Sequence, residues 1–130
     1  MRPKLLFIVT AVIEAATGLA LLVSPALPVS VLLGASLDTP ASLTVARVAG
    51  AALLSLAVAC WLARNDERSP AAKGVVAAML VYNIGAVAVL AFAGTSLRLV
   101  SVALWPAVVL HALMSVWCLA CVRASLNRRN

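Results

Sequence analysis

Acidic side chains are scarce in this chain, which has four Asp and Glu residues against ten Lys and Arg in 130 positions. Aromatic residues account for 5%, charged residues for 11%, and histidine for one position, His111. A water-soluble domain of this size needs far more charge on its surface, so this composition excludes that class. Hydrophobic residues make up 65% of the chain. The composition therefore predicts an integral membrane protein.

Four apolar stretches are long enough to cross a bilayer, which takes about 20 helical residues. They cover residues 5–24, 45–63, 74–93 and 99–122, and with their connections they occupy nearly the whole chain. Short connections between successive helices force neighbours to lie antiparallel. We therefore expect an all-α fold, with residues 1–130 forming a single transmembrane domain, an up-down four-helix bundle.

The connection over residues 25–44 differs from a simple polar loop. Pro25 and Pro28 stop the first helix, but residues 29–33 are apolar again before Gly34 breaks the pattern. We expect a short extra helix or cap here, on the external side of the membrane.

Basic residues gather at one set of predicted helix ends and indicate orientation. Only Arg47 and Arg98 belong to the other side. The positive-inside rule then predicts a multi-pass protein of a bacterial-type inner membrane with both termini in the cytoplasm. Positive charge at this end suits contact with anionic lipid, so we expect membrane lipid and not nucleic acid as a partner. A further copy of the chain or another membrane protein is also a possible partner. The eight residues on the cytoplasmic side are Arg2, Lys4, Arg64, Arg68, Lys73, Arg123, Arg128 and Arg129.

Glu14 is the most informative residue, because it lies in the middle of the first apolar stretch. A charged residue at the centre of a membrane helix costs roughly 2.5 to 3.5 kcal/mol on insertion scales. Such a residue normally faces a protein interior and has a partner or a task. Glu14 thus predicts a functional site inside the membrane.

Counting residues from the basic helix ends predicts that three other polar residues lie at the same depth in the membrane as Glu14. Asn83, Ser55 and His111 lie 10, 9 and 12 residues from Lys73, Arg64 and Arg123, and Glu14 lies 10 from Lys4. At 1.5 Å per residue, all four are about 14 to 18 Å into the membrane. If their helix faces point inward, they form one polar layer at the midplane.

Three further residues are predicted to flank this ligand or proton site. Tyr82 adds a hydroxyl beside Asn83, and Thr17 shares the small, polar stripe of Glu14. Arg47 lies nearer the outer surface, where it lines a vestibule, snorkels to lipid or pairs with Asp38. An imidazole or amide donor near Glu14 suits a proton relay, a cation site or a ligand's polar group. A network that only fixes helix register stays open as an alternative.

Neither a metal site nor a catalytic residue is predicted. His111 is the only histidine, and Cys118 and Cys121 follow it by 7 and 10 residues, too far along a helix for a shared zinc or haem site. The Cys118-x-x-Cys121 pair with Cys60 near the same face has the pattern of thiol redox enzymes. It is similar to the pair that vitamin K epoxide reductase-like membrane proteins use beside a quinone, the one cofactor left open.

Two family resemblances follow from these residues. Glu14 with Thr17 and Gly18 resembles the first helix of the small multidrug resistance transporters, which implies exchange of protons for cationic drugs. The first half of the chain, with Leu32-Leu33-Gly34 and then Arg47-Val48-Ala49-Gly50-Ala51, is similar to DoxX-like membrane proteins. That second resemblance implies a four-helix fold and, for some relatives, quinone-linked sulfur oxidation.

The function predicted is a small membrane protein that binds or moves a small lipophilic or cationic ligand, with or without coupling to protons. A carrier or binder is favoured over an enzyme. Two alternatives stay open: a structural or accessory subunit that docks through the small-residue faces of its first two long helices, and a quinone-linked thiol oxidoreductase.

Overall fold

The computed structural model describes residues 3–66 and 69–126, with side chains as far as Ala124. Arg2, Arg68, Arg128 and Arg129, which contributed to the predicted orientation, lie outside the described residues. Within those residues the chain forms five α-helices and no strand, which confirms the all-α prediction. The helices are α1 (Pro3–Val23), α2 (Ala26–Leu33), α3 (Pro40–Ala63), α4 (Pro70–Thr95) and α5 (Leu104–Leu126).

Among the described residues, four helices, α1, α3, α4 and α5, are long and apolar enough to cross a membrane. The helix α2 is the short extra helix expected in the 25–44 connection. Two of the long helices begin before their apolar stretches do, because polar caps extend them. The Thr39 side chain accepts the Ser42 N–H at the start of α3, and Pro40 occupies the first turn, where no N–H is needed. Ser69 caps α4 in the same way.

The last helix begins later than predicted, at Leu104 instead of residue 99. Arg98 has a positive φ of 55°, which takes the chain out of the helical region directly after α4. The Ala103 N–H then bonds to the Ser101 hydroxyl. Pro106 falls in the first turn of α5, where a proline is tolerated, so the helix starts just before it.

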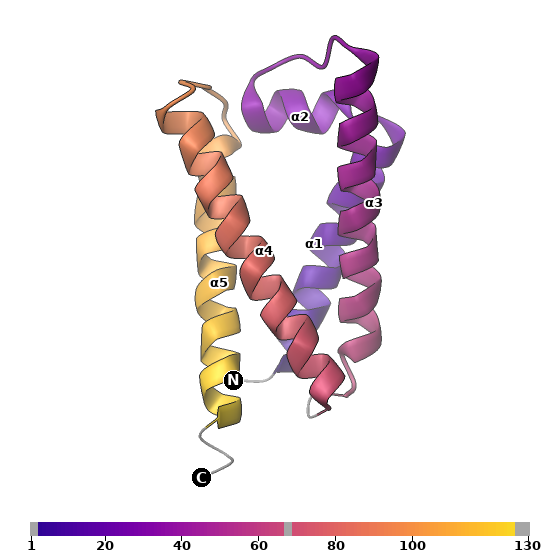
Figure 1. Cartoon of the computed structure of the whole chain (residues 1–130), viewed down its shortest axis with the longest axis vertical. Coiled ribbons are helices and arrows are strands. Elements are labelled where there is room, and N and C mark those ends of the chain that lie inside the picture. The colour runs from indigo at the N-terminus through magenta and orange to yellow at the C-terminus, as the bar shows by residue number, and fades with distance from the viewer. Residues whose placement is uncertain (1–2, 67–68, 127–130) are drawn as a thin grey trace.

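The long helices alternate in direction and form two pairs (Figure 1). α1 packs along α3, α4 packs along α5, and contacts between the two pairs are fewer. The pairs approach each other at the end that holds the α3–α4 connection and diverge toward α2 (Figure 1). The four long helices therefore pack less evenly than in the predicted up-down four-helix bundle.

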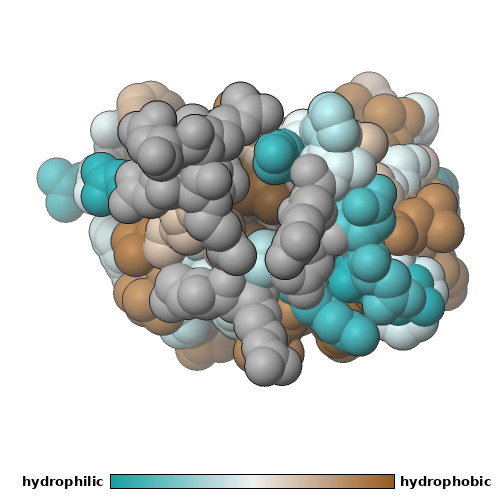
Figure 2. All heavy atoms as spheres, turned by 90° about the horizontal axis from the view of Figure 1, so that it is seen from below, coloured by the Kyte–Doolittle hydropathy of each residue, from teal (hydrophilic) through white to brown (hydrophobic). Residues whose placement is uncertain are grey.

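The apolar core occupies the end where the pairs meet. It takes residues from the start of α1, the end of α3, the start of α4 and the end of α5, among them Phe7, Cys60, Met79 and Cys118. Lys4, Arg64, Lys73 and Arg123 lie at the helix ends beyond this core, and we call this end the basic end. Figure 2 looks at it and shows hydrophilic residues over part of the face, with hydrophobic residues around its sides.

Two glycines allow α1 and α3 to touch through their backbones. A Cβ at Gly18 would lie 2.7 Å from the Gly50 carbonyl oxygen, and a Cβ at Gly50 would lie 2.8 Å from that of Gly18. Small residues permit such close approach, which supplies van der Waals contact between membrane helices. The small-residue faces of the first two long helices, α1 and α3, therefore pack against each other at this point.

The helix α2 lies across the opposite end of the molecule, between the diverging pairs (Figure 1). The Ser101 hydroxyl donates to the Val31 carbonyl, which joins α2 to the connection before α5. Gly34 ends α2 in the left-handed region, with φ 66°, and packs against the Val100 carbonyl. A residue with a side chain would be strained there.

Candidate functional site

Glu14 is buried on α1, with 4% of its surface exposed, and faces α4. The Tyr82 hydroxyl donates to Oε2 of Glu14 over 3.4 Å, which is long for this kind of bond. Among the described residues this is the one hydrogen bond to the carboxyl group, and no ion pair reaches it. A carboxylate has about four acceptor positions, so most of its bonding capacity is unused.

Asn83 and His111 form the second contact of the site, between α4 and α5. The Nδ2 group of Asn83 donates to the Met79 carbonyl over 2.7 Å, and its Oδ1 lies 2.8 Å from Nδ1 of His111. Because a carbonyl only accepts, Nδ2 must face Met79, and Oδ1 must therefore accept from His111. This assigns the proton of the neutral ring to Nδ1 and leaves Nε2 as the nitrogen that can exchange a proton.

The two contacts are joined by their aromatic rings. Tyr82 and His111 meet edge to face, with ring centroids 5.6 Å apart and an angle of 84°. Glu14, Tyr82, Asn83 and His111 thus form one group, which we call the polar cluster. Helices α1, α4 and α5 contribute to it, so it spans both helix pairs.

The polar cluster lies directly next to the apolar core, on the side toward α2. Glu14 follows the core residue Ala11 on α1, Asn83 follows Met79 on α4, and His111 precedes Met114 on α5. The core seals the cluster from the basic end, and the helix pairs diverge on its other side (Figure 1).

Ser55 does not join the polar cluster, although it was predicted to lie in the same polar layer. Its side chain is exposed, and its hydroxyl donates to the Ala51 carbonyl of its own helix over 2.9 Å. Thr17 is also exposed, so it does not flank the site as expected. In both cases the residue lies on a helix face that points away from the interior.

Three roles were left open for Arg47: lining an outer vestibule, snorkelling to lipid, or pairing with Asp38. Its Nε donates to the Leu22 carbonyl over 3.3 Å, so it satisfies a carbonyl in the last turn of α1. Asp38 accepts from the Ser36 hydroxyl, and the described residues contain no ion pair between Arg47 and Asp38. Arg47 is thus an exposed residue of α3 that bonds to the end of α1.

One buried polar group near the cluster was not among the predicted site residues. Thr10 is 1% exposed, and its hydroxyl has no hydrogen-bond partner within the described part of the chain. It lies one turn before Glu14 on the same face of α1, since the two are four residues apart. That i, i+4 spacing is the signal that marks it in the sequence.

The three cysteines are free, buried thiols of the apolar core. The Cys60 sulfur lies 3.5 Å from that of Met79. Within the described residues, no group of three or more His, Cys, Asp or Glu side chains is arranged to hold a metal ion.

The fold and the cluster define a class: an all-helical chain with four helices fit to cross a membrane and a buried polar group between them. Comparison with protein-family models, curated proteins and solved structures gives no match. The resemblances to DoxX-like proteins and to small multidrug resistance transporters stay predictions from the sequence.

Proposed function

We propose that this is a multi-pass protein of a bacterial-type inner membrane, with both termini in the cytoplasm, that binds or moves a small cationic or lipophilic ligand at the polar cluster. The observation that carries the proposal is the Glu14 carboxyl group, 4% exposed and held by one long hydrogen bond from Tyr82. A buried carboxylate with so few donors favours either a proton or a cation.

His111 and Asn83 add a hydrogen-bond acceptor to the polar cluster, beside the charge of Glu14. Oδ1 of Asn83 accepts a hydrogen bond from Nδ1–H of the ring, so Nε2 is available to accept a hydrogen bond or a proton. An edge-to-face contact with Tyr82 holds the ring in place. A ligand that carries a positive charge and an N–H or O–H group can place the charge at Glu14 and donate its hydrogen bond to Nε2 of His111.

Competition between a cation and a proton gives the proposal a definite pH dependence. A cation binds Glu14 only when the carboxyl group is ionised, and binding then releases the proton that was held there. Affinity therefore rises with pH, by at most tenfold per pH unit for one exchanged proton, and levels off once the group is ionised.

The test measures binding of tetraphenylphosphonium, a lipophilic cation, to the purified protein in detergent between pH 5 and 9. We expect affinity to rise with pH and about one proton to be released per cation in weakly buffered solution. Glu14→Gln removes the charge with little change of shape, and should abolish both signals.

Thr17→Val is the matched control, because Thr17 is on the same helix but exposed. It should bind as the wild type does. Equal binding by Glu14→Gln and wild type, with both proteins folded, would rule out Glu14 as the cation site.

The two alternative functions have less support. The glycines of the first two long helices contact each other, so this part of the small-residue surface is unavailable to an accessory partner. The thiols of Cys60, Cys118 and Cys121 are buried in the apolar core, with at most 6% of each residue exposed, so neither a quinone nor a substrate thiol reaches them in this packing.

A further inference from the structure

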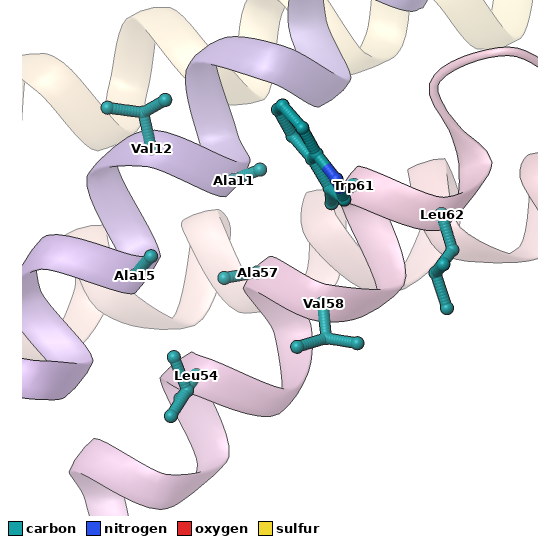
Figure 3. Close-up of a pocket in the computed structure, with 8 residues that line it drawn as sticks. All are labelled: Ala11, Val12, Ala15, Leu54, Ala57, Val58, Trp61 and Leu62. Carbon is teal, nitrogen blue, oxygen red and sulfur yellow. The ribbon is translucent and has the colours of Figure 1, made fainter.

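A hollow with an apolar lining runs between α1 and α3, apart from the side chains of the polar cluster (Figure 3). Its volume is about 320 Å³, within the lower range of small-molecule sites. We call it the α1–α3 groove, and it is lined by Ala11, Val12, Ala15, Leu54, Ala57, Val58, Trp61 and Leu62.

Short side chains create this groove and larger ones border it. Ala11 and Ala57 are buried, whereas Val12 and Val58 are more than half exposed along its edges. Each lining side chain except that of Trp61 is a hydrocarbon. The lining residues of α3 extend from Leu54 to Leu62, about 12 Å along the helix. An alkyl chain suits a groove of this shape and chemistry.

A fixed positive charge lies at the basic end of the groove. The Arg64 guanidinium carbon is 3.9 Å from the ring centre of Trp61, which itself lines the groove. Arg64 also donates to the Trp61 carbonyl through one terminal nitrogen. Stacking and this bond hold the guanidinium over the end of the groove and leave further N–H groups for a phosphate oxygen.

The other helix of the groove also begins with a cation. Lys4 is exposed in the first turn of α1 and shares a stripe with Val12 at a spacing of eight residues. Asp66 follows Arg64 by two residues, but the described residues contain no ion pair between them. An apolar groove with the Arg64 guanidinium held at its basic end matches a molecule with an alkyl chain and an anionic head.

We propose that the α1–α3 groove binds one anionic glycerophospholipid from the leaflet at the basic end, with an acyl chain in the groove and the phosphate at Arg64. A neutral lipid, or an apolar helix from a second copy, has no anionic group to complement the Arg64 guanidinium at the end of the groove. This site is independent of the polar cluster, so either proposal can fail without the other.

Native mass spectrometry of the purified protein with added phosphatidylglycerol or phosphatidylcholine tests the charge. The wild type should retain the anionic lipid more strongly, and Arg64→Gln should lower that preference about fivefold, the effect of one basic residue beside anionic lipid. Arg123→Gln makes the same charge change at the same end but on α5, which lines no part of the groove, and should leave the preference unchanged.

Fluorescence tests where the acyl chain lies. Phosphatidylglycerol with brominated chains should quench Trp61, measured as the difference in quenching between wild type and Trp61→Phe. Ala15→Leu, which fills the groove at a half-buried position, should remove that difference while the helical circular dichroism stays unchanged.

Three results of these lipid experiments would overturn the proposal. They are equal retention of both lipids by the wild type, an equal loss of preference in Arg64→Gln and Arg123→Gln, or quenching that Ala15→Leu leaves intact. Dimers that dissociate on Ala15→Leu would also overturn it, because a second copy would then occupy the groove.

Discussion

At the scale of single residues, Asn83 organises the polar cluster. It is 2% exposed and connects the Met79 carbonyl of its own helix to the His111 ring of the next. The bond to Met79 fixes which end of the amide faces the ring, and this in turn fixes the position of the ring proton. One amide therefore joins α4 to α5 and sets the hydrogen-bonding character of His111.

Asn83→Leu should destabilise the protein, because it leaves the Nδ1–H group of His111 without its acceptor in a half-buried place. The expected loss is about 1 to 3 kcal/mol in the free energy of unfolding, measured by denaturation in mixed micelles. Nitrogen-15 NMR should show the Nδ1–H tautomer in wild type and a mixture of tautomers in Asn83→Leu.

Ser55→Ala serves as the control, since Ser55 is exposed and bonds to its own helix. It should change stability by less than about 0.5 kcal/mol. An Nε2–H tautomer in the wild type would contradict the hydrogen-bond assignment of the cluster.

At the scale of elements, the contact between Gly18 and Gly50 decides how closely α1 and α3 pack. A new Cβ at Gly18 meets backbone atoms of α3 and has no flexible side chain to displace, whereas a Cβ at Gly85 of α4 meets nothing within 4 Å. Replacing glycine by alanine at each of these two sites therefore separates the effect of helix propensity on stability from the effect of helix packing.

Gly18→Ala should lower the free energy of unfolding by about 1 to 3 kcal/mol through overpacking. Gly85→Ala should be neutral, or should raise it by up to about 1 kcal/mol, because alanine favours a helix. Thermal unfolding in detergent compares them. Equal effects of the two variants would show that close α1–α3 contact is unimportant for stability.

Gly34, at the end of α2, allows a test whose effect should stay local. Gly34→Ala places a side chain at a positive φ and against the Val100 carbonyl, so α2 should loosen without separating the long helices. Hydrogen exchange should accelerate over residues 26–34 and stay unchanged in α1 and α3. Gly74→Ala, at an open helical position, should leave both regions unchanged.

The sequence predicts which segments become helices far better than it predicts which faces meet. Apolar length determines the spans, and counting from basic residues pointed to Glu14, Asn83 and His111, which the contacts of the polar cluster bring together. Depth does not give the direction in which a side chain points. On helices that are apolar all round, no amphipathic pattern marks the inner face, and Ser55 was therefore expected to face inward, whereas its side chain is exposed.

Two other differences have local causes. The apolar stretches do not include the caps at Thr39 and Ser69, so α3 and α4 begin earlier than predicted. The separation into two helix pairs depends on a backbone contact at Gly18 and Gly50, and many small residues elsewhere in the chain look the same in the sequence.

At the scale of the whole molecule, the described basic residues divide between the two ends. Lys4, Arg64, Lys73 and Arg123 share one end, and Arg98 follows α4 at the other. If the basic end faces the cytoplasm, a fluorescent protein fused after residue 130 should fluoresce and alkaline phosphatase fused there should be inactive. Phosphatase fused after Arg98 should be active. The reverse pattern would contradict the proposed orientation.

The contact between Glu14 and Tyr82 also sets an order of events during synthesis. The two residues are 68 positions apart, so if the chain enters the bilayer as it is translated, α1 does so before Tyr82 has been made. α1 and α3 can already pair through Gly18 and Gly50 at that stage, but the carboxyl group has no donor from α4. A nascent chain that ends before α4 therefore carries the Glu14 carboxyl group without the donor that it has in the finished protein.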